Sequence, residues 1–267
     1  MSRPYAEVIG DPIAQSKSPL IHNFWLEKLG IDAEYRACHV RPGELVDYFS
    51  QRRGDAEWRG CNITMPHKQA VIPLLDAIDP AAARIGAVNT VVPENGGLAG
   101  YNTDLPGFLE PLGEQRFDVV SVVGAGGAAR AILAALADRG VRWISLQNRS
   151  IDKGEALLAE FGLDGFVVAP GEEVPTAELL VNTSSLGMAG YPPMPPVERF
   201  VMDGGIVYDI VTHPLDTELL RRARGRGLRT IDGLAMLIGQ AAVAFEKFFG
   251  QPAPRGHDAE LRARLTS

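Results

Sequence analysis

A glycine-rich turn between a strand and a helix constrains the fold of this 267-residue chain more than any other feature. Val119–Val123 consists of valines and one serine, with high β propensity, and leads directly into the sequence GAGGA at Gly124–Ala128. Residues 128–137 then have the pattern of a helix. At such a turn, residues without a Cβ let a pyrophosphate approach the backbone at the helix N-terminus. The segment therefore predicts a dinucleotide-binding unit, with a plain structural turn as the alternative.

Strands and helices continue to alternate after this turn. The sequence predicts strands at 143–147, 179–182 and 205–210, and helices at 153–161, 217–226 and 234–249. A β-α-β-α-β order of this kind is typical of a doubly wound parallel sheet. A short helix is expected in the tail after Pro254.

The first hundred residues predict a second α/β unit. Expected strands lie at 6–9, 35–39, 61–64 and 87–92, expected helices at 20–29 and 67–75, and a turn at 94–97, with Pro73 breaking the second helix. Strands alternating with helices imply a mostly parallel sheet. We expect a substrate domain of residues 1–103 plus 236–267 and a Rossmann dinucleotide domain of residues 104–235.

Composition excludes several classes of protein. A net charge of −7 and a pI of about 5.3 argue against nucleic acid as the main partner. No apolar run reaches the roughly 18 residues that span a bilayer, and the first residues lack the layout of a signal peptide. Two cysteines and five histidines without ligand spacing predict no disulfide framework and no metal. We expect a cytoplasmic protein without a membrane segment.

The end of the strand at 143–147 indicates which dinucleotide is bound. NAD enzymes usually place an acidic residue there to bind the ribose 2′-hydroxyl. This chain has Asn148-Arg149-Ser150, with Lys153 three positions later. A carboxylate would repel a 2′-phosphate, whereas a guanidinium binds it with charge-assisted hydrogen bonds. The sequence therefore predicts NADP, with solvated surface charges as the alternative.

Polar clusters follow the expected strands of the first unit. They are Ser16-Lys17-Ser18, the segment 62–68, Asn89-Thr90 and Asn102-Thr103-Asp104. Ligands of parallel sheets gather at the carboxyl ends of strands, and these groups suit a polyhydroxylated anion. Each also has a structural alternative, because Ser18 or Asp104 could cap a helix and Asn62 or Thr64 could satisfy strand-end backbone groups. Lys68, one of five lysines, falls at an expected helix start, against the helix dipole.

These motifs together resemble the shikimate dehydrogenase family. The resemblance rests on eight motifs in family order between residue 5 and about 245, which are Ser16–Ser18, Asn62–Lys68, Ala87–Thr90, Asn102–Asp104, Gly124–Ala128, Asn148–Ser150, Asn182–Met188 and Asp232–Leu237. Members of the family interconvert 3-dehydroshikimate and shikimate with NADPH or NADP. The resemblance implies the same reaction here, in the shikimate pathway of aromatic amino-acid and chorismate biosynthesis.

The resemblance also implies roles for individual residues. Ser16 and Ser18 would bind the substrate carboxylate, and Lys68 and Asp104 would form the catalytic pair. The residues expected to hold the ring hydroxyls are Asn62, Thr64, Asn89, Asp104 and Gln240. The residues expected to bind the cofactor are Gly124, Ala125, Gly126, Gly127, Ala128, Asn148, Arg149, Ser150, Lys153, Thr183, Met188, Ile210 and Gly233.

The predicted chemistry agrees with these residue types. Reduction of a ketone needs a hydride at carbon and a proton at oxygen, and the cofactor and a positioned acid supply them. The Lys68 ammonium can polarise the developing alkoxide and donate the proton, while Asp104 orients it.

Three positions depart from the family pattern. Thr212 stands where a Tyr is frequent, Leu105-Pro106 precede Gly107 where a Gly directly after Asp104 is usual, and Ala235 stands where Gly is common. These differences leave open a quinate or aminoshikimate dehydrogenase. A folate-specific dehydrogenase with a catalytic Lys and a non-catalytic NADPH-binding sensor are further alternatives, which Ser16 with Ser18 and the intact Lys68–Asp104 pair respectively argue against. We expect a monomer or homodimer that binds a small-molecule substrate.

Overall fold

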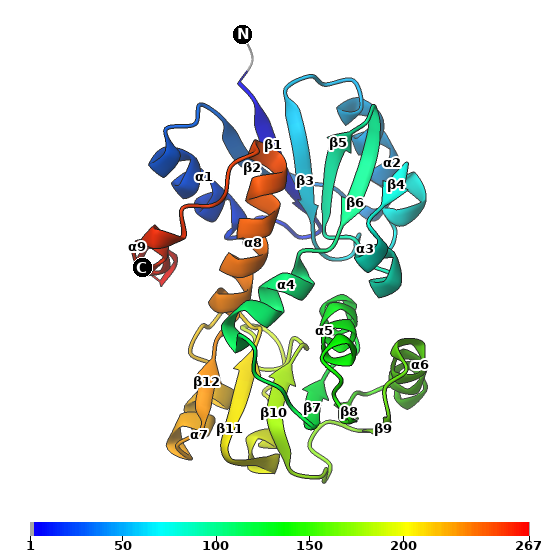
Figure 1. Cartoon of the computed structure of the whole chain (residues 1–267), viewed down its shortest axis with the longest axis vertical. Coiled ribbons are helices and arrows are strands. Elements are labelled where there is room, and N and C mark those ends of the chain that lie inside the picture. Colours follow the sequence, from blue (N-terminus) through cyan, green and yellow to red (C-terminus); the bar gives the residue numbers. More distant parts are fainter. Residues whose placement is uncertain (1–2, 267) are drawn as a thin grey trace. The chain divides into compact units, whose positions relative to one another are not determined.

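The computed structural model describes residues 3–266, which divide into two compact units. Unit 1 comprises residues up to Gly107 and from Ile238 onward, and unit 2 comprises Phe108–Leu237. Asp104, which we expected to open the second domain, therefore lies in unit 1. The chain leaves unit 1 within one helix and returns to it within another (Figure 1).

Unit 1 is built on a six-stranded mixed sheet. The strand order is β2-β1-β3-β5-β6-β4. The strands are β1 (Tyr5–Gly10), β2 (Glu34–His39), β3 (Trp58–Ile63), β4 (Ala77–Ile78), β5 (Thr90–Glu94) and β6 (Gly97–Tyr101). The helices are α1 (Ser18–Leu29), α2 (Leu45–Arg52), α3 (Pro80–Ile85), α4 (Asp104–Leu109), α8 (Gly233–Phe249) and α9 (Asp258–Thr266), of which α4 and α8 continue into unit 2.

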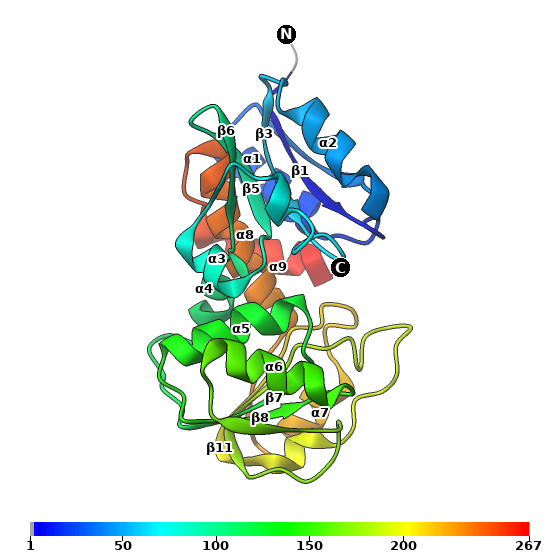
Figure 2. The same cartoon turned by 90° about the vertical axis from the view of Figure 1, so that its right-hand side faces the viewer.

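Strand β1 is central, and its six residues are all buried. Successive side chains of a strand point to opposite faces. Tyr5 and Ile9 accordingly pack with the α2 residues Tyr48 and Phe49, whereas Ala6 and Val8 belong to a cluster that contains Phe248 of α8. Figure 2 shows α2 and α8 on opposite sides of this sheet.

The expectation of a mostly parallel sheet is confirmed in unit 1, with β5 as the exception among the described strands. β1 pairs in parallel with β2 and β3, and β4 pairs in parallel with β6, but β5 is antiparallel to both β3 and β6. A two-residue loop, Asn95-Gly96, joins β5 to β6, and both residues have positive φ values of 50° and 80°. Such a loop fits a tight hairpin, because its twist matches that of the strands. The expected turn is thus present, and a strand that we did not predict follows it.

The helix predicted at 67–75 is also absent. The segment forms successive turns and a single 3₁₀ turn at Ile72–Leu74. Pro73 lies inside this stretch and cannot donate the hydrogen bond that a continuous helix needs. Lys68 therefore lies in a turn, and the helix-dipole argument for its importance does not apply.

Unit 2 contains a fully parallel sheet in the order β12-β11-β10-β7-β8-β9. The strands are β7 (Val119–Val123), β8 (Trp143–Gln147), β9 (Gly165–Val168), β10 (Ala177–Asn182), β11 (Val201–Asp209) and β12 (Arg229–Ile231). The helices are α5 (Gly127–Asp138), α6 (Ile151–Phe161) and α7 (Glu218–Gly225), and Figure 2 shows α5 and α6 along one side of the sheet. Counted along the chain, this is the doubly wound order 3-2-1-4-5-6, whose direction reverses between β7 and β10.

Candidate functional site

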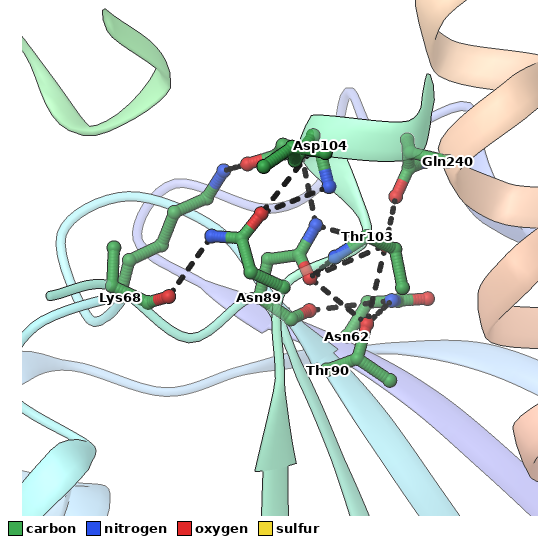
Figure 3. A network of polar contacts seen from close by, with 10 residues as sticks. Asn62, Lys68, Asn89, Thr90, Thr103, Asp104 and Gln240 are labelled. Atoms are coloured by element: carbon green, nitrogen blue, oxygen red, sulfur yellow. Dashed lines mark hydrogen bonds and ion pairs between the residues drawn. The ribbon is translucent and has the colours of Figure 1, made fainter. Parts of the chain in front are cut away.

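The polar residues of unit 1 gather at one edge of its sheet (Figure 3). β3 and β6 end at this edge, and β5 begins there because it runs antiparallel to both. Asn89 and Thr90 thus lie at the start of a strand, where the sequence predicted its end. The sheet still brings them beside Asn62 from β3 and Thr103, which follows β6.

Lys68 and Asp104 form an ion pair at this edge. The distance from Lys68 Nζ to Asp104 Oδ2 is 2.5 Å, and the two side chains are 18% and 9% exposed. Asp104 is the first residue of α4, but its side chain does not cap the helix. Asn102 Oδ1 instead accepts hydrogen bonds from the backbone N–H groups of Asp104 and Leu105, at 3.1 and 3.4 Å. The Asp104 carboxylate is therefore available for Lys68.

Asn89 fixes the other oxygen of the Asp104 carboxylate. Its Nδ2 donates to Asp104 Oδ1 at 2.9 Å and to Thr103 Oγ1 at 3.0 Å. Its Oδ1 accepts from the Thr103 N–H at 2.7 Å and from the Thr90 hydroxyl at 3.0 Å. These donors determine which end of the amide faces Asp104, so the carboxylate that meets Lys68 is held from behind by a buried network.

Asn62 extends the network toward the core. Its Nδ2 donates to Thr90 Oγ1 at 2.9 Å, and its Oδ1 accepts from the Tyr35 hydroxyl at 2.6 Å. Burial raises the pKa of Tyr35 well above its usual range, so this hydroxyl keeps its proton as the donor. Sequence reasoning missed Tyr35 and assigned no role to Thr90. Thr90 at least belongs to the Asn89-Thr90 cluster seen in the sequence, whereas Tyr35 is only the first residue of the expected strand at 35–39.

Gln240 reaches the same network from α8. Its Oε1 accepts from Thr103 Oγ1 at 3.3 Å, across 137 residues of sequence. Gly107 of α4 makes this approach possible, because a Cβ there would lie 2.6 Å from the Gln240 backbone nitrogen. The glycine that follows the departure at Leu105-Pro106 thus lies where α4 packs closely against α8.

The remaining predicted substrate residues lie on neighbouring segments of unit 1. Ser16 and Ser18 flank Lys17 at the start of α1, and the Ser18 N–H donates to Ser16 Oγ at 3.3 Å. Ser18 is buried, but α1 has no side-chain cap, so the capping alternative for Ser18 is wrong. Thr64 directly follows β3. Its methyl group fits against Gly10 because Gly10 has no Cβ, which would lie 2.4 Å from that methyl carbon.

In unit 2 the predicted glycine loop lies at the point where the strand order reverses. Gly124 follows β7 with a φ of 100°, a conformation that favours glycine. A Cβ at Gly124 would lie 2.9 Å from Thr183 Oγ1 and 3.0 Å from the Ser184 nitrogen, both at the end of β10. Gly124 is therefore required by backbone geometry and by the neighbouring strand end.

The next glycines leave space for a ligand. A Cβ at Gly126 would meet no atom within 4 Å, and Gly126 and Gly127 are both exposed. Gly126 precedes α5, whose first turn has no side-chain cap. The first backbone N–H groups of a helix lack partners within it and suit a phosphate. The loop therefore fits the pyrophosphate of a dinucleotide.

The cations predicted to recognise a 2′-phosphate are also accessible. Arg149 and Lys153 are exposed, and within residues 3–266 neither forms an ion pair. Asn148 Nδ2 donates to the Ser150 carbonyl at 2.8 Å, which shapes the turn after β8. The segment after β8 thus presents Arg149 and Lys153 without ion-pair partners among the described residues, and Asn148 rather than an acidic residue directly follows the strand.

Four further predicted cofactor residues lie near the carboxyl ends of β10 and β11. Thr183 Oγ1 donates to the Val123 carbonyl at 2.8 Å, which ties the end of β10 to that of β7. Ile210 follows β11, and Met188 lies in the turns after β10. Gly233 opens α8, and a Cβ there would lie 2.4 Å from the Val211 carbonyl oxygen. These positions surround the same end of the parallel sheet as Gly124.

Across residues 3–266, no group of three or more His, Cys, Asp or Glu side chains could hold a metal ion. None of the helices in that range is long and apolar enough to cross a membrane.

Comparison with known proteins yields matches at both ends of the chain. A family model described as the shikimate dehydrogenase substrate binding domain matches residues 8–91. A second, described as the shikimate 5′-dehydrogenase C-terminal domain, matches residues 233–259. The curated shikimate dehydrogenase (NADP(+)) of Sphingopyxis alaskensis is 55% identical over 267 residues, covering 99% of this chain and 97% of the relative.

Solved structures resemble the whole chain. Shikimate 5-dehydrogenase from Thermus thermophilus, in complex with NADP(H) and shikimate, superposes with a TM-score of 0.87 at 37% identity, covering 98% of this chain and 99% of the other. The ligand-free 5-ketofructose reductase of a Gluconobacter strain superposes with a TM-score of 0.88 at 30% identity, covering 99% of each chain.

Proposed function

This chain belongs to the shikimate dehydrogenase family, and on that premise we propose that it reduces 3-dehydroshikimate to shikimate with Lys68 as the proton donor. The reaction is reversible, is part of the shikimate pathway of aromatic amino-acid biosynthesis, and uses NADP as its cofactor. One observation supports the residue roles above all others. The Lys68–Asp104 pair, at 2.5 Å, is embedded in a network whose other members are amides and hydroxyls.

The proposed mechanism starts from the Lys68 ammonium. Bound NADPH supplies the hydride to the carbonyl carbon of the substrate. Lys68 stabilises the charge that develops on the carbonyl oxygen and transfers a proton from Nζ to it, which yields the alcohol. Asp104 holds Nζ in place through Oδ2, while Asn89 prevents the carboxylate from rotating away. In the reverse direction the neutral Lys68 amine accepts the proton.

Substrate recognition is proposed to use the groups around this pair. Asn62, Thr64, Asn89, Asp104 and Gln240 offer donors and acceptors for ring hydroxyls, and Ser16 and Ser18 offer hydroxyls to the carboxylate. The network already satisfies the inner faces of the Asn62 and Asn89 amides, so ordering these side chains costs little when substrate binds. This preorganisation favours a small ring with fixed hydroxyl positions.

The cofactor is proposed to bind at the carboxyl ends of the unit 2 strands. The backbone at Gly124–Ala128 would hold the pyrophosphate, and Asn148, Arg149, Ser150 and Lys153 the 2′-phosphate. Thr183, Met188, Ile210 and Gly233 would line the remainder of the same site. The exposed, unpaired guanidinium of Arg149 supports selection of NADP over NAD.

Location and assembly are proposals as well. We place the enzyme in the cytoplasm, in agreement with its two free thiols, Cys38 and Cys61. A monomer or a homodimer suffices, because each proposed substrate contact belongs to unit 1 of a single chain.

The test is a set of initial rates with shikimate or quinate, each with NADP or NAD, followed by absorbance of the reduced cofactor. We expect rapid turnover of shikimate with NADP and slow turnover in the other three combinations. Arg149→Ala is expected to raise the KM for NADP about tenfold, as for a lost charge-assisted contact, and to leave the KM for NAD unchanged. Faster turnover of quinate, or an equal effect of Arg149→Ala on both cofactors, would contradict the proposal.

A further inference from the structure

The loop that carries Ser16 and Ser18 is tied to the C-terminal helix through the residue between them. Lys17 Nζ donates a hydrogen bond of 2.8 Å to the carbonyl oxygen of Leu265, 248 residues later in the sequence. Leu265 lies in the last turn of α9. The last carbonyl groups of a helix have no partner within it, and the negative end of the helix dipole favours a cation. Lys17 meets both requirements.

Helix α9 is anchored on α1 independently of Lys17. Lys28 Nζ lies 2.7 Å from Glu260 Oε2, and the guanidinium of Arg264 lies 4.8 Å from the centre of the Phe24 ring. Leu261 and Leu265 are both buried. The C-terminal end of α9 is therefore a fixed point against which a neighbouring loop can be held.

The backbone around Lys17 transmits this restraint to both serines. Lys17 is the residue that precedes α1, and its carbonyl accepts the Ile21 N–H at 3.2 Å. On the other side, the Ser18 N–H donates to Ser16 Oγ at 3.3 Å. Holding the Lys17 side chain thus limits how Ser16 and Ser18 can move relative to each other and to α1.

We infer that α9, acting through Lys17, positions the Ser16–Ser18 loop for the substrate carboxylate. This inference rests on the proposed function of the two serines. Lys17 is a positioning residue, because its Nζ is engaged by the Leu265 carbonyl. The C-terminal helix thereby contributes to substrate affinity without contacting the reacting atoms.

Kinetics of Lys17→Met test the inference, with Lys28→Met as the matched control. Each substitution removes one lysine contact to α9, but only Lys17 belongs to the Ser16–Ser18 loop. For Lys17→Met we expect a KM for shikimate raised about 3- to 10-fold, the effect of one lost hydrogen bond, with an unchanged kcat and KM for NADP. For Lys28→Met we expect the KM for shikimate and the KM for NADP to stay within about twofold of wild type. Lys17→Arg, which keeps a donor, should recover most of the affinity.

Three outcomes would overturn the inference. An unchanged KM for shikimate in Lys17→Met would overturn it. An equal rise of this KM in Lys28→Met would also overturn it, because α9 would then act only on stability. A Ser18→Ala variant separates this from failure of the proposed function. If Ser18→Ala raises the KM for shikimate while Lys17→Met does not, only the role of α9 is wrong. If Ser18→Ala has no effect, the carboxylate site itself is wrong, and the inference falls with it.

Discussion

The two units prepare their sites by different physical means. In unit 1, the side chain of Asp104 is held by other side chains, and Asn89 donates to Asp104 through Nδ2 while its Oδ1 accepts from the Thr103 N–H. In unit 2, Gly124 and Gly126 contribute backbone and free space, and Arg149 is an exposed charge without a partner in the described chain. The proposed substrate site is thus built from hydrogen-bonded side chains, whereas the proposed nucleotide site offers open backbone and an exposed charge.

This difference predicts that the two sites respond to different kinds of substitution. A side-chain network should lose function when a single atom changes, even if volume is kept, because each buried polar group depends on its neighbour. A backbone cradle should tolerate changes of side-chain chemistry but not the addition of a Cβ at the wrong position. Substitutions in each unit can therefore test this difference.

The largest effect is expected for Lys68→Met in unit 1. This substitution keeps the length of the side chain but removes the proton donor and the partner of Asp104. General acid catalysis is worth about 10²- to 10⁴-fold, so we expect kcat for shikimate oxidation to fall by that factor. The KM for NADP should stay unchanged, because the proposed cofactor residues belong to unit 2. Steady-state kinetics at saturating shikimate measure both constants.

Asn89→Asp tests the same network at a residue that holds Asp104 rather than at the proton donor. It keeps the shape of the amide but puts an acceptor where Nδ2 donates to Asp104, so kcat should fall with little loss of volume. A kcat within a few-fold of wild type in Lys68→Met would remove Lys68 from the chemistry. It would also remove the reason for calling unit 1 the preorganised half.

A smaller effect is expected from paired glycine substitutions in unit 2. Gly124→Ala places a Cβ 2.9 Å from Thr183 Oγ1 at a φ of 100°, and should lower the free energy of unfolding by about 1–3 kcal/mol. Gly126→Ala meets open space and should change stability by less than about 0.5 kcal/mol. It should nevertheless raise the KM for NADP, because the added methyl group occupies the proposed pyrophosphate position. Urea denaturation and cofactor kinetics separate the two effects.

Equal destabilisation by both alanines would show that the loop is only a structural turn. A normal KM for NADP in a stable Gly126→Ala variant would place the pyrophosphate elsewhere. Either result would leave unit 1 as the half with a defined site.

The same contrast explains which parts of the molecule could be predicted from sequence. In unit 2, the strands β7, β8, β10 and β11 and the helices α5, α6 and α7 follow local patterns, and their predicted positions are confirmed apart from their ends. β9 was missed because its residues are only half-buried and include a glycine. A doubly wound sheet repeats one local unit, so local reasoning is sufficient for most of it.

Unit 1 depends more on contacts between distant residues. The helical spacing of residues 67–75 was outweighed by Pro73 and by backbone pairing of this segment, in which the Lys68 carbonyl accepts the Val88 N–H at 2.8 Å. The motifs revealed most of the polar residues at the sheet edge. Tyr35 could not be found in this way, because its bond to Asn62 connects β2 with β3 across the intervening β1 and leaves no local signal.

The smallest predicted effect distinguishes the interiors of the two units by pH. His22 in unit 1 is fully buried, and both its ring nitrogens lack a hydrogen-bond partner in the described chain. Its ring is stacked on Tyr35, with the ring centres 4.0 Å apart, and burial lowers its pKa to about 3. In unit 2, burial instead raises the pKa of Asp209, although Asn182 and Thr217 donate to it. Acid therefore opposes folding through His22 and favours it through Asp209.

The sign for His22 follows from proton binding in the two states. Below its ordinary pKa of 6.5 the unfolded chain binds a proton at this residue, whereas the folded chain does not until about pH 3. Between pH 7.5 and 5.5 this should lower the free energy of unfolding by about 1.4 kcal/mol. Urea denaturation followed by tryptophan fluorescence suits the measurement, because Trp25 and Trp58 are buried in unit 1, whereas Trp143 of unit 2 is 39% exposed and should change less on unfolding. His22→Phe cannot titrate and should remove this loss, so an equal pH dependence in wild type and variant would show that another group controls the acid sensitivity of unit 1.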